Sequence, residues 1–201
     1  MNYEANFEAL GSEIPSIEPS VPPDAQFVLY QQVGNLLIVS GYGPFQGAAI
    51  PPEFTGKVGE QLTVQQGYKA ARLTAINLLL IVRQALGTLN RVAHVVEVTG
   101  LVNCPPDFTQ QPAVINGCSD LLIQVFGENG RHVRTAAGAN ALAFDISIEI
   151  SISLLVNDAP MPNPTTPSPN VGDALLHYLS LEQVTHVFGI PGGGLSNLLT
   201  S

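Results

Sequence analysis

The pattern of apolar residues predicts two long helices and a short one. Apolar side chains recur every three or four positions over residues 64–86 and again from about 112 to 126, as in a helix with one buried face. Thr63 is a suitable N-cap for the first long helix, and Gly87 ends it. A shorter amphipathic helix is predicted over residues 3–10.

Four further segments have the composition or the two-residue alternation of β-strands. They are residues 27–32, 36–40, 92–102 and 144–156. A hairpin turn, Val33-Gly34-Asn35, joins the first two. In the last segment one face consists mainly of isoleucines, whereas the other carries Glu149 among serines. The order β-β-α-β-α-β predicts an α+β fold, in which helices cover one face of a mixed sheet.

The composition changes after residue 156. Residues 157–170 contain five prolines, which predicts an extended linker. Residues 171–201 predict a helix, a short strand and a glycine-rich turn, a set too short to bury a core of its own. We therefore expect one domain over residues 1–156, a linker, and the first piece of an incomplete second domain.

Composition and charge exclude several classes of protein. Hydrophobic residues make up 45% of the chain and charged residues 11%, so it can bury a core, and its few charges favour a homo-oligomer. The net charge of −9, without a basic cluster, disfavours nucleic-acid binding. An acidic N-terminus and the lack of a long apolar run predict a cytoplasmic protein that does not bind membranes. Cys104 and Cys118 are expected to be buried, reduced thiols.

The residues best suited to chemistry lie within residues 130–151. Arg134 is surrounded by small uncharged residues, and Glu149 follows fifteen positions later on the polar face of the predicted strand. A guanidinium binds a carboxylate through two parallel hydrogen bonds, and a carboxylate can accept a proton from water. The pair favours a site for a small acidic substrate, although either residue could instead form a structural ion pair. The four histidines lack metal-ligand spacing, so no metal site is predicted.

Three long segments in order resemble one known family. They read GNLLIVSGYGP at 34–44, TGKVGEQLTVQQGYKAARLTAINLL at 55–79 and PPDFTQQPAVINGCSDLLIQVFGENGRHVRTAAG at 105–138. Together with the last strand they make residues 1–156 similar to the RidA/YjgF proteins. The resemblance implies a chorismate-mutase-like α+β fold and a homotrimer, with active sites in clefts between subunits.

The resemblance also implies an activity, the hydrolysis of 2-imino or enamine acids to 2-keto acids and ammonia. Arg134 takes the place of the carboxylate-binding arginine, and Glu149 that of the glutamate that orients water. Further substrate-binding positions match at Ser40, Gly41, Asn116, Phe27 and Ala136. The last two depart from the family, because a tyrosine is common in place of Phe27 and a cysteine in place of Ala136. These departures bear on the range of substrates more than on the type of reaction.

The tail, residues 171–201, is similar to the start of the pyrimidine-binding domain of thiamine-diphosphate enzymes such as acetolactate synthase. The catalytic glutamate and the diphosphate motif of those enzymes lie beyond this segment, so no cofactor is expected for this chain. The alternative to an imine hydrolase is a non-catalytic module. Such a module would bind small carboxylates, or trimerise a thiamine-diphosphate enzyme fused to it. A ribonuclease is disfavoured by the acidic charge and by the lack of a histidine pair.

Overall fold

The computed structural model describes residues 2–22 and 24–157. The predicted tail over 171–201 lies outside these residues, as does the predicted linker after its first residue. No helix in the part of the chain that the structure describes is long and apolar enough to cross a membrane.

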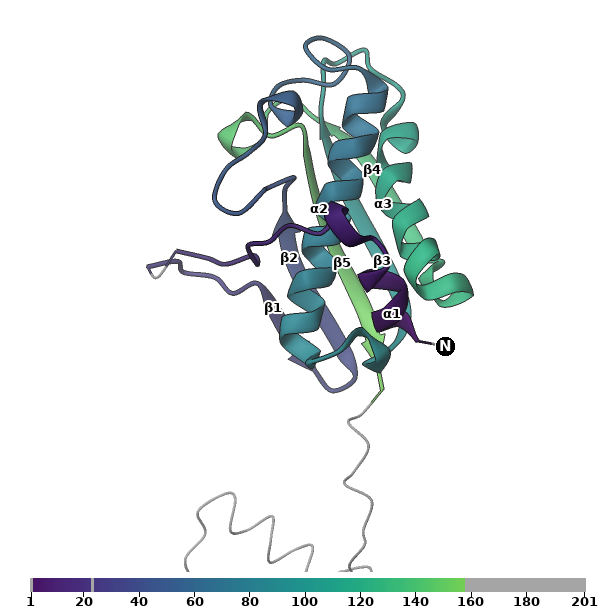
Figure 1. Ribbon diagram of the computed structural model, residues 1–201. Coiled ribbons are helices and arrows are strands. Elements are labelled where there is room, and N and C mark those ends of the chain that lie inside the picture. The colour runs from purple at the N-terminus through teal and green to yellow at the C-terminus, as the bar shows by residue number, and fades with distance from the viewer. Residues whose placement is uncertain (1, 23, 158–201) are drawn as a thin grey trace, which may run out of the picture. The chain divides into compact units, whose positions relative to one another are not determined.

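A five-stranded sheet with helices on one face forms the described domain (Figure 1). The elements, besides short 3-10 turns, are α1 (Tyr3–Glu8), β1 (Tyr30–Val33), β2 (Leu36–Tyr42), α2 (Val64–Leu86), β3 (Val92–Asn103), α3 (Gln111–Phe126), β4 (Val133–Ala139) and β5 (Ile148–Val156). The strand order is β1-β2-β5-β3-β4, and all neighbours are antiparallel except β3 and β4, which are parallel. The predicted mixed sheet, with its helices on one face, is confirmed.

Alternation along β5 separates the two faces of the sheet. Ile148, Ile150 and Ile152 are at most 2% exposed because α2 and α3 cover their face. Glu149 and Ser151 are half-buried and lie on the opposite face. We call this opposite side the open face, since no helix of the described residues covers it.

The two long helices begin and pack as the sequence indicates. Thr63 and Gln66 form a capping box at the start of α2, and Gly87 ends the helix with a left-handed φ of 77°. Helix α3 crosses α2 at Gly117, where a Cβ atom would overlap the carbonyl oxygen of Tyr68. Both cysteines are free and buried, as expected, and burial raises the pKa of Cys118 to about 12.

The C-terminal half differs from its prediction in three ways. Strand β4 was not predicted, because its small residues have little strand propensity and only its pairing with β3 makes it a strand. The last strand begins at Ile148 and not at 144, because Phe144 and Asp145 have left-handed φ values of 57° and 55°. Ser147, predicted on the polar face, is fully buried.

The hairpin at the start of the domain also differs from its prediction. Strand β1 begins at Tyr30, three residues later than expected, and β2 continues to Tyr42. Residues 27–29 are instead tied to β2 at Ser40, whose Oγ donates to the Val28 carbonyl at 2.7 Å and whose N–H donates to the Leu29 carbonyl at 2.8 Å. The segment therefore runs beside β2 without forming a regular strand.

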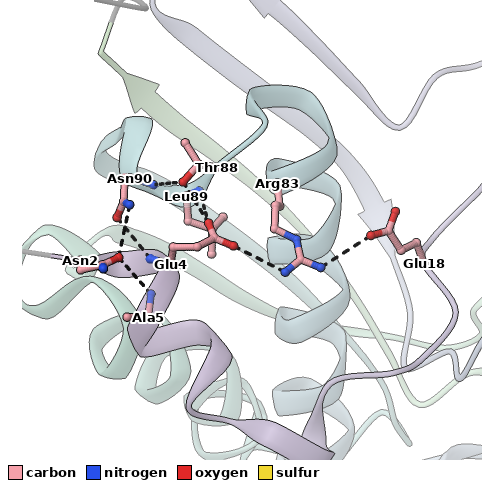
Figure 2. Close-up of polar contacts among 8 residues, drawn as sticks. All are labelled: Asn2, Glu4, Ala5, Glu18, Arg83, Thr88, Leu89 and Asn90. Atoms are coloured by element: carbon pink, nitrogen blue, oxygen red, sulfur yellow. Dashed lines mark hydrogen bonds and ion pairs between the residues drawn. The ribbon is translucent and has the colours of Figure 1, made fainter.

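The N-terminal arm, residues 2–22, is tied to the end of α2 through Glu4 (Figure 2). The Glu4 carboxylate accepts hydrogen bonds from the Leu89 N–H at 2.7 Å and the Thr88 hydroxyl at 3.1 Å. It also lies 3.5 Å from the Arg83 guanidinium, which in turn lies 3.6 Å from Glu18 further along the arm. One half-buried carboxylate thus joins α1 to the turn between α2 and β3.

Replacing Glu4 by alanine should destabilise the domain. The substitution leaves the partly buried Leu89 N–H without its acceptor, which costs about 1–2 kcal/mol. Urea unfolding followed by circular dichroism measures the change. The matched control is Glu8→Ala at the exposed end of α1. Equal unfolding midpoints for the two variants would contradict the anchoring role of Glu4.

Candidate functional site

Arg134 lies on β4 and is held in place by helix α3. Its Nη1 donates to Asn116 Oδ1 at 2.8 Å and to Ser119 Oγ at 3.0 Å. The register pairs Arg134 with Val98 of β3, which is fully buried under the helices. Arg134 therefore emerges on the helix-covered face of the sheet, at its edge, beside a hollow of about 200 Å³.

The guanidinium of Arg134 has no carboxylate partner among the described residues. Three other arginines do pair with glutamates, namely Arg72, Arg83 and Arg131. Both acceptors of Arg134 are neutral and both bind the same nitrogen, so Nε and Nη2 are left to form a two-pronged contact with an incoming carboxylate. This arrangement orients a cation without neutralising it.

A chain of hydrogen bonds continues from Arg134 to His132. The His132 Nδ1 lies 2.7 Å from the Gly130 carbonyl, which can only accept, so this nitrogen carries the hydrogen. In the neutral ring Nε2 is then an acceptor, and it takes the Ser119 hydroxyl hydrogen at 3.0 Å. The Ser119 oxygen remains free to accept from Arg134. Burial lowers the pKa of His132, as does the positive charge of Arg134, and both effects favour this neutral form.

Glu149 lies in a second part of the molecule, together with Gly41 and Phe27. Strand β2 has an irregularity between Val39 and Tyr42, which brings Gly41 against Glu149. A Cβ atom at Gly41 would lie 2.6 Å from the Glu149 carboxylate, so a side chain there would displace the carboxylate. All three residues line a cavity of about 760 Å³.

Arg134 and Glu149 lie on opposite faces of the sheet within one chain. Glu149 pairs with Leu101 on β3, three residues along from Val98, and β3 separates the two strands. The strands of the two residues are two strand spacings apart, and the residues are offset by three positions along the strand direction. Their Cα atoms therefore lie about 14 Å apart. Their side chains also point away from each other, because Glu149 is on the open face. A small substrate therefore cannot contact both residues of the same chain.

The predicted site residues form two groups. Asn116 and Ala136 lie with Arg134, whereas Phe27, Ser40 and Gly41 lie with Glu149. The hydroxyl of Ser40 already donates to a backbone carbonyl. Ser119 is a site residue that was not predicted from the sequence, although a serine three positions after Asn116 shares its helix face, and this spacing could have indicated it.

His94 and His132 lie closer together than the sequence suggests. His94 of β3 is near enough to His132 for its charge to contribute to the lowered pKa of His132. Both nitrogens of His132 are engaged in hydrogen bonds, so this pair is not arranged for acid–base catalysis. The part of the chain that the structure describes has no group of three His, Cys, Asp or Glu side chains placed to hold a metal ion.

The hydrogen-bond chain predicts the tautomer and the titration of His132. Because the folded pKa lies below 6.5, the neutral ring contributes stability that is present above about pH 6.5 and is lost as the pH falls through the folded pKa. Nitrogen NMR of the imidazole should show the Nδ1–H tautomer and a midpoint below that of the unfolded chain. An Nε2–H tautomer, or a midpoint above 6.5, would refute the hydrogen-bond assignment.

Comparison with known proteins shows the family to which the chain belongs. Residues 4–149 match the family model described as "YjgF/chorismate mutase-like, putative endoribonuclease". The protein TCP17 of Trypanosoma cruzi is 38% identical over 155 residues, which are 77% of this chain and 94% of that protein.

Two solved structures are also similar. A protein of unknown function from Agrobacterium tumefaciens is 36% identical with a TM-score of 0.67, covering 77% of this chain and 92% of that one. A structure described as a "putative endoribonuclease" from Shewanella oneidensis is 28% identical with a TM-score of 0.70, covering 78% and 100%. On its sequence and on its chorismate-mutase-like α+β fold, this chain belongs to the YjgF/RidA family.

Proposed function

We propose that this protein hydrolyses 2-imino acids, and their enamine tautomers, to 2-keto acids and ammonia. The observation that carries the proposal is the state of Arg134, which is oriented by Asn116 and Ser119 but has no carboxylate partner in the described part of the chain. A fixed and unneutralised guanidinium suits a substrate that has a carboxylate beside its reactive carbon.

In this proposal Glu149 activates the water. The water oxygen bonds to the imine carbon while Glu149 accepts one of its protons, and the electron pair of the C=N bond moves to nitrogen, which takes that proton from Glu149. Glu149 then accepts the second proton from the hydroxyl of the adduct and passes it to nitrogen, which converts the nitrogen into a leaving group. The C–N bond then breaks, ammonia departs, and the remaining oxygen forms the keto group. One water is consumed, and Glu149 returns to its ionised form.

The site is proposed to form between copies of the chain, in a homotrimer. Arg134 and Glu149 face away from each other in one chain, so one substrate can meet both only if they come from two subunits. The open face is suited to such contact, because it carries exposed apolar side chains that water disfavours. These include Val33, Leu36, Ile38 and Leu155.

The alternative is a non-catalytic module that binds small carboxylates or trimerises a fused enzyme. It is favoured by the contacts of Arg134, because Asn116 and Ser119 orient the guanidinium without any contribution from Glu149. Residues 171–201 are predicted to resemble the start of a thiamine-diphosphate enzyme, and such an enzyme would be the fused partner. This resemblance stays a prediction. Saturable binding of a 2-keto acid without any imine turnover would favour the alternative.

Arg134→Ala should lower kcat/KM for an imino acid about 100-fold, because it removes a two-pronged charge-assisted contact. Arg134→Lys should be intermediate, since it keeps the charge but loses the planar fork. The measurement is the release of keto acid from an imino acid generated by an amino-acid oxidase. Lys69→Ala, an exposed charge on α2, is the control and should match the wild type.

Glu149→Gln keeps the size of the side chain against Gly41 and should lower kcat about 100-fold with little change in KM. If both Arg134→Ala and Glu149→Gln kept the wild-type rate, the hydrolase proposal would fail.

A further inference from the structure

The cavity beside Glu149 is larger than a site for imine hydrolysis alone requires. It is bounded by the N-terminal arm at residues 17–22, by the segment after β2 at residues 41–48, and by residues 143–149 leading into β5. Its volume is about 760 Å³, within the range of pockets that enclose whole drug-sized ligands. A substrate with a methyl or hydroxymethyl side chain would leave most of this space without contacts.

The chemistry of the cavity is apolar. Its only charged residues, among those that the structure describes, are Glu18 and Glu149. Glu18 is already engaged, because its carboxylate lies 3.6 Å from Arg83 and accepts a hydrogen bond from Gln84 at 3.0 Å. Figure 2 shows its contact with Arg83. Among the described residues, Glu149 is therefore the one lining carboxylate without an ion pair, beside a mostly apolar cavity.

Three large apolar side chains line the cavity yet are exposed to water. Ile17 is 61% exposed, Phe27 58% and Phe144 77%. Exposed apolar groups gathered around a cavity are typical of a binding site, since a ligand would remove them from water.

The backbone at Phe144 is strained, and buried groups hold it in that conformation. Phe144 has a φ of 57° and a ψ of 18°. Residues other than glycine rarely adopt this backbone conformation, which costs about 1–3 kcal/mol. The buried amide of Asn103 donates to Asp145 Oδ1 at 3.1 Å and to the Ile146 carbonyl at 3.2 Å. The domain core, through Asn103, thus maintains the strained backbone. This backbone conformation places the aromatic ring of Phe144 beside the cavity.

The arm that forms one wall is held by contacts within the chain. Ile17 packs against Gly47, where a Cβ atom would lie 2.8 Å from the Ile17 side chain. The Pro19 carbonyl accepts from Gln84 on α2 at 3.1 Å. The opposite wall is held by Asn77, whose buried amide donates to the carbonyls of Gly43 and Phe45 at 3.1 and 2.9 Å. The cavity is therefore preformed, which reduces the entropy that binding must overcome.

We infer that this cavity takes the apolar side chain of the substrate, so that the protein prefers 2-imino acids with aromatic or branched aliphatic side chains over those with small ones. The inference rests on the proposed function, because it places the imine carbon at Glu149. Phe144 and Ile17 become specificity-determining residues that contact the side chain and take no part in the reaction.

The test compares imino acids derived from phenylalanine and from alanine, each generated by an amino-acid oxidase. Wild-type kcat/KM should be higher for the aromatic substrate. Phe144→Ala should lower the ratio of the two kcat/KM values about tenfold, since it removes one apolar wall. Ala48→Trp should lower the ratio as well, because Ala48 lines the cavity from an exposed position and the larger ring would fill it. Val28→Ala, which is 57% exposed but does not line the cavity, is the control and should leave the ratio unchanged.

The outcomes separate this inference from the proposed function. Equal or faster turnover of the small imino acid would overturn the inference and leave the hydrolase intact. If neither imino acid is hydrolysed, the hydrolase proposal fails and the cavity is tested by calorimetry with phenylpyruvate and pyruvate. Tighter binding of phenylpyruvate, weakened by Ala48→Trp, would support an apolar acid-binding cavity. No binding, or equal binding of the two acids, would overturn it.

Discussion

Strand β3 determines how the residues of the candidate site relate to one another. It lies between β4 and β5, so its register fixes both Arg134 and Glu149. Because side chains alternate between faces, the three-residue offset between the two pairings sends one residue to the helix face and the other to the open face. No rotamer change can reverse this, and any substrate that needs both groups requires a second copy of the chain.

The two parts of the site are stabilised by different means. Arg134 depends on side chains, through a chain of hydrogen bonds to neutral partners that ends at a backbone carbonyl, and this suits a group that must keep its charge available. The cavity beside Glu149 depends on backbone held by buried amides, Asn77 and Asn103. The N-terminal arm, anchored through Glu4 and Glu18, completes the cavity wall.

The sequence predicts the fold well where periodicity is strong. The bounds of α2 and α3 and the alternation in β5 followed from apolar spacing, because each element packs one face against a single core. It does not predict β4, whose strand form depends on pairing with distant residues. The left-handed turn at Phe144 is equally hidden, since the amide that stabilises it is remote in the chain. Arg134 and Glu149 were identifiable as residues, but their opposite faces required the register.

The most direct test of a site shared between subunits is to mix two inactive variants. Arg134→Ala chains retain Glu149, and Glu149→Gln chains retain Arg134, so unfolding and refolding them together should create some complete sites. Random assembly of a ring predicts recovery of about a quarter of wild-type activity, while each variant refolded alone stays inactive. No recovery from a mixture shown by mass spectrometry to contain mixed oligomers would contradict a site built from two chains.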